Sequence, residues 1–339
     1  MKFVRILLFP FAVLYDVITT IRNFFYDIKV FSSSSFKTPT IVVGNLSVGG
    51  TGKTPQIEYL VRLLKEKYKI AILSRGYKRK TSGYLLLNKS HTYLDSGDEP
   101  MQFFKKFKNI TVAVDENRTR GVNTLLENEN IDVILLDDAY QHRKVKGGFN
   151  VLLTKYDDLF TDDYLLPTGG LRESRRGANR ANVILVTKSP VDLSLKQSET
   201  ILNKLKAYQK PVFFTAIKYA NEIKGTVKGL TLDSLKSFEV LLITGIANPK
   251  SLLSFFNEEN IKYNHLEYAD HHHFSEAEIN NIQKEFTCIN SERKIILTTE
   301  KDYIRLSSSI KELAYIEIET YFLNHQGLLF NQLLENYVK

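Results

Sequence analysis

Short, unbroken runs of hydrophobic residues recur along the chain, and polar segments with helical spacing of their apolar residues separate them. Continuous rather than alternating hydrophobicity is typical of parallel strands that helices cover on both faces. We therefore expect an α/β fold with a doubly wound, mostly parallel sheet over residues 36–215. The runs that predict its strands cover residues 38–43, 70–73, 110–114, 133–136, 151–153, 183–186 and 212–214.

A second set of hydrophobic runs follows this region. Residues 240–243 and 295–297 predict two more buried strands, with helical patterns between them. They indicate a second, smaller α/β domain over residues 216–339. The polarity of residues 214–219 and 315–320 alternates, so we expect these segments to pair as a two-stranded connector between the domains.

The N-terminal segment has a pattern of its own. Residues 6–15 are all apolar, a run shorter than the about 20 residues of a membrane-spanning helix. The small residues of a signal-peptide cleavage site do not follow this run. Apolar residues then recur at helical spacing, which predicts an amphipathic helix within residues 1–35. They are Leu14, Ile18, Ile21, Phe25 and Ile28.

Two placements of this helix are open. Packing on the core of the protein is the commoner outcome for an amphipathic helix. The alternative is the membrane interface, with Arg22 and Lys29 near lipid headgroups. A concentration of phenylalanines favours the membrane, so we expect a peripheral or monotopic membrane protein. These are Phe3, Phe9, Phe11, Phe24 and Phe25.

Composition narrows the possible partners. The chain of 339 residues has a net charge of +8, which favours an anionic partner such as a nucleotide or an acidic membrane surface. It has no dense Lys/Arg run or RNA-binding motif that would indicate nucleic acid. The single cysteine, Cys288, cannot form an internal disulfide, which fits a reducing cytoplasm.

A glycine-rich loop lies between the first predicted strand and a helix that includes Pro55. This layout is typical of a phosphate-binding P-loop, whose backbone N–H groups and helix N-terminus favour anions. Lys53 is expected at the β- and γ-phosphates of ATP and the Thr54 hydroxyl at Mg²⁺. Ser47 stands where the strict motif has glycine. The expected nucleotide-binding residues are Ser47, Val48, Gly49, Gly50, Thr51, Gly52, Lys53 and Thr54.

Two pairs of adjacent acidic residues are candidates for metal binding and proton transfer. Asp137 and Asp138 end the strand at 133–136, the position of the Mg²⁺-facing acid in P-loop proteins. Asp98 and Glu99 precede a helical pattern, where capping of that helix is one interpretation. The other is that one carboxylate faces the metal and the other acts as general base toward an alcohol.

The run from Asp270 to His273 is the densest titratable cluster. Consecutive histidines on an extended segment point to opposite faces, so they cannot all bind one zinc ion. A solvated loop and a histidine that orients a carboxylate base are both open interpretations. Arg75, Arg118 and Arg172 lie in loops between apolar runs and are candidates for phosphate binding.

Taken together, these segments resemble the tetraacyldisaccharide 4′-kinase family of lipid A biosynthesis, over most of the chain. The resemblance implies ATP-dependent transfer of the γ-phosphate to the 4′-hydroxyl of tetraacyldisaccharide 1-phosphate, a lipid A precursor. It also implies the cytoplasmic face of the inner membrane of a Gram-negative bacterium. The segments that carry it are residues 43–55, 73–77, 97–100, 136–142, 167–173, 270–272 and 299–302.

The resemblance also implies roles for individual residues. Asp98 matches the general base of the family, and His271 matches its partner histidine. Lys53 and Thr54 match the P-loop lysine and threonine. The acids that match metal and nucleotide positions are Glu99, Asp137 and Asp138. The residues that match positions linked to catalysis or substrate phosphate are Arg118, Gln141 and Arg172.

This sequence departs from the family at several positions. The family tolerates a residue other than glycine at position 47. Ala139 stands where the family often has glycine and Ser174 where it often has proline, but neither change removes a chemical group. Because Asp98 and His271 lie in different predicted domains, we hypothesise that domain closure accompanies ATP binding.

Two other functions share parts of these patterns. A metallochaperone GTPase or ATPase would use the histidine run for metal delivery, but residues 299–302 lack the spacer between Lys and Asp of a guanine-reading motif. A partition ATPase would carry an extra lysine where Val48 stands. We expect a monomer that acts on a lipid at the membrane surface.

Overall fold

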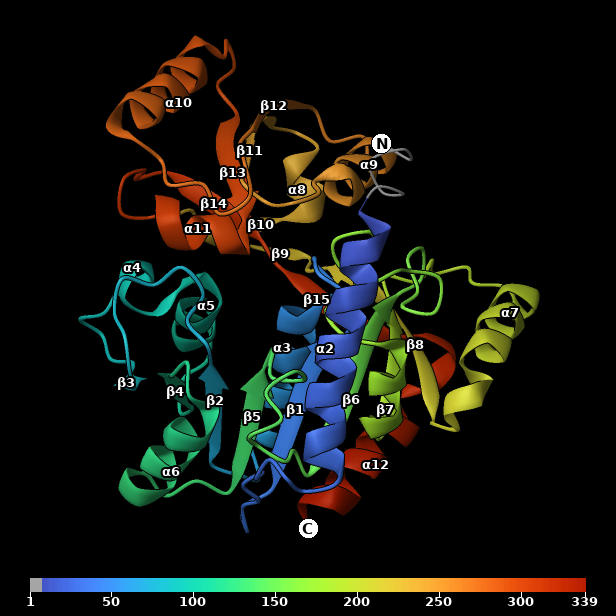
Figure 1. The fold of residues 1–339 in the computed structure, drawn as a ribbon. Coiled ribbons are helices and arrows are strands. Elements are labelled where there is room, and N and C mark those ends of the chain that lie inside the picture. Colours follow the sequence, from blue (N-terminus) through green and yellow to red (C-terminus); the bar gives the residue numbers. More distant parts are fainter. Residues whose placement is uncertain (1–7) are drawn as a thin grey trace.

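The computed structural model describes residues 8–339, and its strands form two sheets (Figure 1). Within those residues the larger sheet has nine strands, and all neighbours pair in parallel except β15 with β8 and β3 with β4. In order across the sheet they are β15 (Ile318–Phe322), β8 (Val212–Tyr219), β7 (Val183–Thr187), β6 (Phe149–Lys155), β1 (Thr40–Asn45), β5 (Val133–Asp137), β2 (Ile70–Ser74), β4 (Thr111–Val114) and β3 (Leu85–Leu86).

Helices cover both faces of this sheet. Successive residues of each strand enter different apolar clusters; Ile41 and Val43 lie in one cluster and Val42 in the other. The first cluster includes residues of α3 (Lys53–Leu64), α5 (Asp98–Lys106) and α12 (Gly327–Val338). The second includes residues of α6 (Arg118–Asn128) and α7 (Leu195–Leu205). The expected α/β fold with a mostly parallel sheet is confirmed.

The smaller sheet contains the second set of predicted strands. Its order is β10 (Leu230–Thr231), β9 (Glu222–Gly225), β14 (Leu313–Ile316), β13 (Lys294–Thr299), β11 (Glu239–Thr244) and β12 (Tyr263–Glu267). The helices around it are α8 (Leu232–Leu235), α9 (Lys250–Glu258), α10 (Glu276–Cys288) and α11 (Glu300–Leu306). The remaining short helices are α4 (Tyr93–Ser96), η1 (Arg175–Arg180), η2 (Lys206–Tyr208) and η3 (Leu323–His325).

Two adjacent strands connect the sheets. β8 and β15 pair antiparallel, and Tyr219 lies opposite Ile318, which confirms the predicted pairing of these segments. The structure differs from a simple division at residue 215, because β15 and α12 pack with the larger sheet. Phe330 and Leu334 of α12 are fully buried in its core. The smaller sheet is therefore an insertion between two strands of the larger one.

The expected N-terminal helix is present as α2 (Phe9–Asp27), which lies along the larger sheet (Figure 1). Its polar side chains face the protein: Tyr15 donates to the Arg172 carbonyl at 2.8 Å and Asn23 to Glu173 at 2.9 Å. Most of its large apolar side chains are exposed, Phe25 is half-buried, and of its residues only Ala12 and Thr19 are buried. Residues 1–7, including the start of the apolar run, lie outside the described residues. No helix within residues 8–339 is long and apolar enough to cross a membrane.

Candidate active site

The glycine-rich loop has the conformation that its sequence predicts. Gly49 and Gly52 have φ values of 100° and 84°, a left-handed region that favours glycine. Gly52 precedes the first residue of α3, so the N-terminus of this helix opens into the loop. The end of β7 holds the loop from one side, because the Thr187 hydroxyl donates to the Thr51 carbonyl at 2.8 Å. The loop is therefore pre-formed for an anion.

Lys53, Asp138 and Arg172 meet beside this loop. The Lys53 Nζ lies 3.6 Å from Asp138 Oδ1 and 3.4 Å from Asn45 Oδ1. One Arg172 nitrogen lies 3.1 Å from both Asp138 oxygens. Burial favours a raised pKa for the Asp138 carboxyl, but Lys53 and Arg172 outweigh burial and hold that pKa below its usual value.

Asp137 is the last residue of β5, and its carboxylate accepts a hydrogen bond from Ser74 at 2.8 Å. Burial raises the pKa of Asp137 to about 6, and the negative charges of Asp138 and Glu99 act in the same direction. Acids that repel one another in this way are suited to share a cation. Glu99 therefore lies near enough to Asp137 for its negative charge to act on that carboxyl.

The oxygen donors beside the P-loop fit the expected Mg²⁺ only if a bound nucleotide supplies further ligands. Within residues 8–339, no three His, Cys, Asp or Glu side chains form a group that could hold a metal ion. Mg²⁺ commonly binds through one or two carboxylates together with substrate phosphates. Asp137 and Asp138, with the hydroxyl of Thr54, suit a Mg²⁺ held jointly with a nucleotide.

Arg118 and Gln141 support the ends of the strands rather than pointing freely into solvent. Arg118 is 2% exposed, donates to the Asp115 and Asp137 carbonyls, and has its pKa lowered to about 10 by burial. The Gln141 amide donates to the Asn45 carbonyl at 2.8 Å and to Glu173 at 3.0 Å. Both side chains thus fix backbone next to the loop and the acids.

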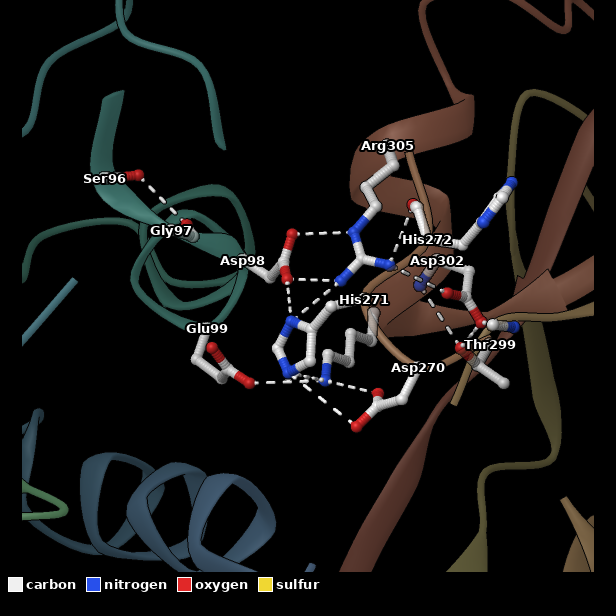
Figure 2. A network of polar contacts seen from close by, with 12 residues as sticks. Ser96, Gly97, Asp98, Glu99, Asp270, His271, His272, Thr299, Asp302 and Arg305 are labelled. Carbon is white, nitrogen blue, oxygen red and sulfur yellow. Dashed lines mark hydrogen bonds and ion pairs between the residues drawn. The ribbon is translucent and has the colours of Figure 1, made fainter. Parts of the chain in front are cut away.

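Asp98 and His271 meet although 173 positions separate them in sequence (Figure 2). Asp98 is the first residue of α5, and His271 lies in the loop after β12. His271 Nδ1 is 2.7 Å from Asp98 Oδ2. The side chain of Asp98 makes no capping hydrogen bond, so the capping interpretation is wrong and the predicted pairing is confirmed.

The histidine run divides among different neighbours. His272 Nε2 lies 2.9 Å from Glu278, and the His273 ring stacks on Tyr93 with centroids 5.9 Å apart. Only His271 faces the carboxylate of Asp98. A shared zinc site at this run, already disfavoured by its geometry, finds no support in the described residues.

Comparison with known proteins decides the family. A model described as tetraacyldisaccharide-1-P 4′-kinase matches residues 4–338. The tetraacyldisaccharide 4′-kinase of Flavobacterium johnsoniae is 52% identical over 330 residues, which cover 96% of this chain and 95% of the relative. That of Bacteroides thetaiotaomicron is 43% identical and covers 98% of this chain and 93% of its own.

A solved structure agrees with these relatives. LpxK from Aquifex aeolicus in complex with ATP has a TM-score of 0.80 and 29% sequence identity, over 99% of this chain and 100% of that chain. The chain belongs to the tetraacyldisaccharide-1-P 4′-kinase family. It is therefore an enzyme of the kinase class, and the GTPase and partition-ATPase alternatives are excluded.

Two residues of this kinase at the Asp98–His271 pair were not singled out from the sequence. Arg305 of α11 donates its Nε to Asp98 Oδ1 at 2.8 Å and its Nη2 to Oδ2 (Figure 2). Lys301 places its ammonium 3.0 Å from His271 Nε2 and 3.4 Å from Glu99. Lys301 lies within the resemblance at 299–302 and Arg305 just beyond it, but neither residue was assigned a role from the sequence.

Lys301 determines which nitrogen of His271 carries hydrogen. An ammonium group has donors and no acceptor, so Nε2 of His271 accepts from Lys301. Arg305 Nη2 also lies 3.2 Å from Nδ1, but Asp98 Oδ2 is the nearer partner of both nitrogens. Nδ1 then carries the hydrogen and donates it to Asp98 Oδ2. In this tautomer the Nδ1 that faces Asp98 is a donor and has no free lone pair for a proton.

Proposed function

We propose that this kinase transfers the γ-phosphate of ATP to the 4′-hydroxyl of tetraacyldisaccharide 1-phosphate, with Asp98 as general base. The observation that carries the proposal is the Asp98–His271 pair. Glu99, next to Asp98 in the sequence, raises the pKa of Asp137 beside the P-loop, so the pair and the loop belong to one site. The names of the relatives supply the substrate, and the neighbouring structure with ATP supplies the nucleotide.

ATP is proposed to bind along the loop from Ser47 to Thr54. Two buried atoms in the described residues support a polar ligand at this loop, because Thr51 Oγ1 and Asn45 Nδ2 have no hydrogen-bond partner within the protein. Lys53 would balance charge on the β- and γ-phosphates. Mg²⁺, held by Thr54 and the nearby acids, would supply further positive charge at the phosphates when bound.

The proton transfer follows from the contacts of Asp98. As the sugar oxygen attacks the γ-phosphorus, its proton passes to the carboxylate, the bond to the β-phosphate oxygen breaks, and ADP leaves. His271 orients the carboxylate through its Nδ1–H. Arg172 would exchange its Asp138 partner for phosphate oxygens, while Arg118 and Gln141 keep the loop and acids in place.

The lipid substrate is proposed to reach the site at a membrane surface, on the cytoplasmic face of the inner membrane. α2 supports this placement because its polar side is bound to the protein and its apolar side is exposed. The parts then have separate roles: residues 1–35 bind the membrane, residues 36–215 bind nucleotide, and the smaller sheet within 216–339 supplies His271. Closure of the two sheets is proposed to accompany ATP binding, and the Asp98–His271 contact of 2.7 Å is the arrangement that the closed form would hold.

The test is phosphate transfer from ATP to the lipid precursor in detergent or vesicles, measured on Asp98→Asn and on the wild type. Asn keeps the size of Asp98 and removes its basicity, so the transfer rate should fall by about 100-fold or more. ATP binding should stay within about twofold, because Asp98 lies outside the P-loop. Asp95→Asn is the matched control, because Asp95 lies in the neighbouring helix α4 and pairs with Thr92 instead of His271.

Two outcomes would contradict the proposal. If Asp98→Asn transferred phosphate at the wild-type rate, Asp98 would not be the general base. ATP consumption that does not depend on the lipid would contradict the lipid as phosphate acceptor. Equal consumption of GTP would contradict ATP as the specific phosphate donor.

A further inference from the structure

Arg305 is the only partner of Asp98 in the described residues that contacts both of its carboxylate oxygens. Its side chain is 1% exposed, and it reaches Asp98 from α11, on the other sheet. We infer that Arg305, itself anchored by Asp302, is a positioning residue that presents one oxygen of Asp98, Oδ1, to the acceptor hydroxyl. This inference rests on the proposed role of Asp98 as general base.

The hydrogen bonds determine which oxygen remains available. A carboxylate has two acceptor sites on each oxygen. Oδ2 receives Arg305 Nη2 and His271 Nδ1, so both of its sites are used. Among residues 8–339, Oδ1 receives only Arg305 Nε, at 2.8 Å. The single free site of Asp98 is therefore on Oδ1, and a hydroxyl group that donates to Asp98 must approach there.

Asp302 fixes the arginine from behind. It is fully buried and accepts from the Gly245 N–H at 2.9 Å and from the Thr299 hydroxyl at 2.7 Å. Its other oxygen, Oδ1, has no hydrogen-bond partner within residues 8–339 and lies 3.6 Å from Arg305 Nη1. The same Nη1 donates to the His272 carbonyl at 3.2 Å. Apart from Asp98 itself, the groups named here that hold the guanidinium come from the part of the chain that forms the smaller sheet (Figure 2).

The charge of Arg305 also acts on Asp98. Burial favours a raised pKa for the Asp98 carboxyl, but hydrogen bonds from Arg305 and His271 outweigh burial and hold that pKa well below its usual value. A planar fork that contacts both oxygens aligns a carboxylate better than an ammonium group does. Arg305 should therefore influence both the orientation and the protonation of the base.

The experiment compares Arg305→Gln, Arg305→Lys and Arg305→Ala with the wild type, measuring kcat, KM for the lipid and the pH profile of kcat/KM. Loss of alignment should lower kcat about 10- to 100-fold in Arg305→Gln with KM for the lipid unchanged. The acidic limb of the profile should move to higher pH, because a buried Asp98 without Arg305 protonates more readily. Arg305→Lys, which keeps the charge, should restore the acidic limb but only part of kcat.

Chemical rescue separates positioning from folding. Added guanidinium should raise the kcat of Arg305→Ala in a saturable manner, because the cavity left by the side chain faces Asp98. Arg62→Ala is the control: Arg62 also pairs with carboxylates, 3.3 Å from Glu58 and 3.4 Å from Glu319, and has no hydrogen bond or ion pair with Asp98 among residues 8–339. It should keep wild-type kcat and show no response to guanidinium.

Three results would overturn the inference: wild-type kcat in Arg305→Gln, an unmoved acidic limb in all three variants, or lost activity that tracks a lower melting temperature without rescue. The Asp98→Asn variant distinguishes these failures from failure of the proposed function. If Asp98→Asn loses transfer and Arg305→Gln does not, the positioning role of Arg305 is wrong and the general-base role of Asp98 stands. If Asp98→Asn retains transfer, the base assignment falls and the positioning role falls with it.

Discussion

At the scale of single residues, the site divides into parts that local sequence predicts and parts that it does not. Gly49 and Gly52 adopt left-handed conformations that only their own residue type favours, so the motif predicts the loop directly. Arg305 gains its role only when α11 packs against α5, which brings it to Asp98. Nothing in the residues around Arg305 reports that contact. The resemblance to a family found Asp98 and His271, but it gave no geometry.

The orientation of His271 gives a prediction at this scale. Asn places its amide N–H close to the position of the histidine Nδ1–H, whereas the longer Gln reaches toward the position of Nε2. His271→Asn should retain kcat within about tenfold of the wild type, and His271→Gln should lose about 100-fold. His271 has a φ of 60°, which Asn tolerates better than Gln does, so the two variants could differ in stability. The melting temperature of each variant is therefore measured as the control for folding. Higher activity in His271→Gln than in His271→Asn would show that the tautomer is the opposite one.

At the scale of elements, hydrophobic runs predicted the strands because each strand of a covered parallel sheet is buried on both faces. The run before the P-loop became β1, and the alternating segments became the antiparallel pair β8 and β15. The return of α12 to the larger sheet was not predictable in this way. A helical apolar stripe says that a helix is covered, but it does not say by which sheet.

α2 gives the prediction at the element scale. Its side chains Leu14 and Ile18 are 58% and 56% exposed, so replacing both with Ser should leave the melting temperature unchanged and weaken binding to anionic vesicles about tenfold or more. Leu195 of α7, which is 79% exposed, is the matched control, and Leu195→Ser should bind vesicles as the wild type does. Equal loss of binding in both proteins, or in neither, would contradict a membrane role specific to α2.

At the scale of the whole molecule, one buried lysine joins the two sheets. Lys106 of α5 lies 2.8 Å from Glu58 of α3, 2.7 Å from Glu300 of α11 and 3.5 Å from Glu317, which precedes β15. Three carboxylates around one ammonium group cannot all be ionised without strong repulsion. Burial, together with the charge of Glu58, raises the pKa of Glu300 to about 8.

This cluster predicts a pH dependence of stability. Because the pKa of Glu300 is raised above its ordinary value of 4.5 in the folded protein, its contribution is fully present below pH 4.5 and is lost as the pH rises toward 8. In the wild type the free energy of unfolding should therefore fall between pH 6 and pH 8. Glu300→Gln should make this fall smaller by about 1–3 kcal/mol. Urea unfolding at both pH values measures this. Glu319→Gln, at a half-buried acid on β15, should leave the pH dependence as it is. An unchanged pH dependence in Glu300→Gln would contradict the raised pKa of Glu300.

The insertion of the smaller sheet between β8 and β15 has a consequence for synthesis on the ribosome. All strands of the smaller sheet emerge before residues 318–338, which complete the core of the larger sheet. The smaller sheet can therefore close while the nucleotide-binding core still lacks one edge strand and the helix that covers Phe213 and Phe322. Until α12 is made, Phe149 of β6 and Phe213 of β8 lack the aromatic side chains of α12 that pack against them, and we expect chaperones to bind this apolar face of the nascent chain.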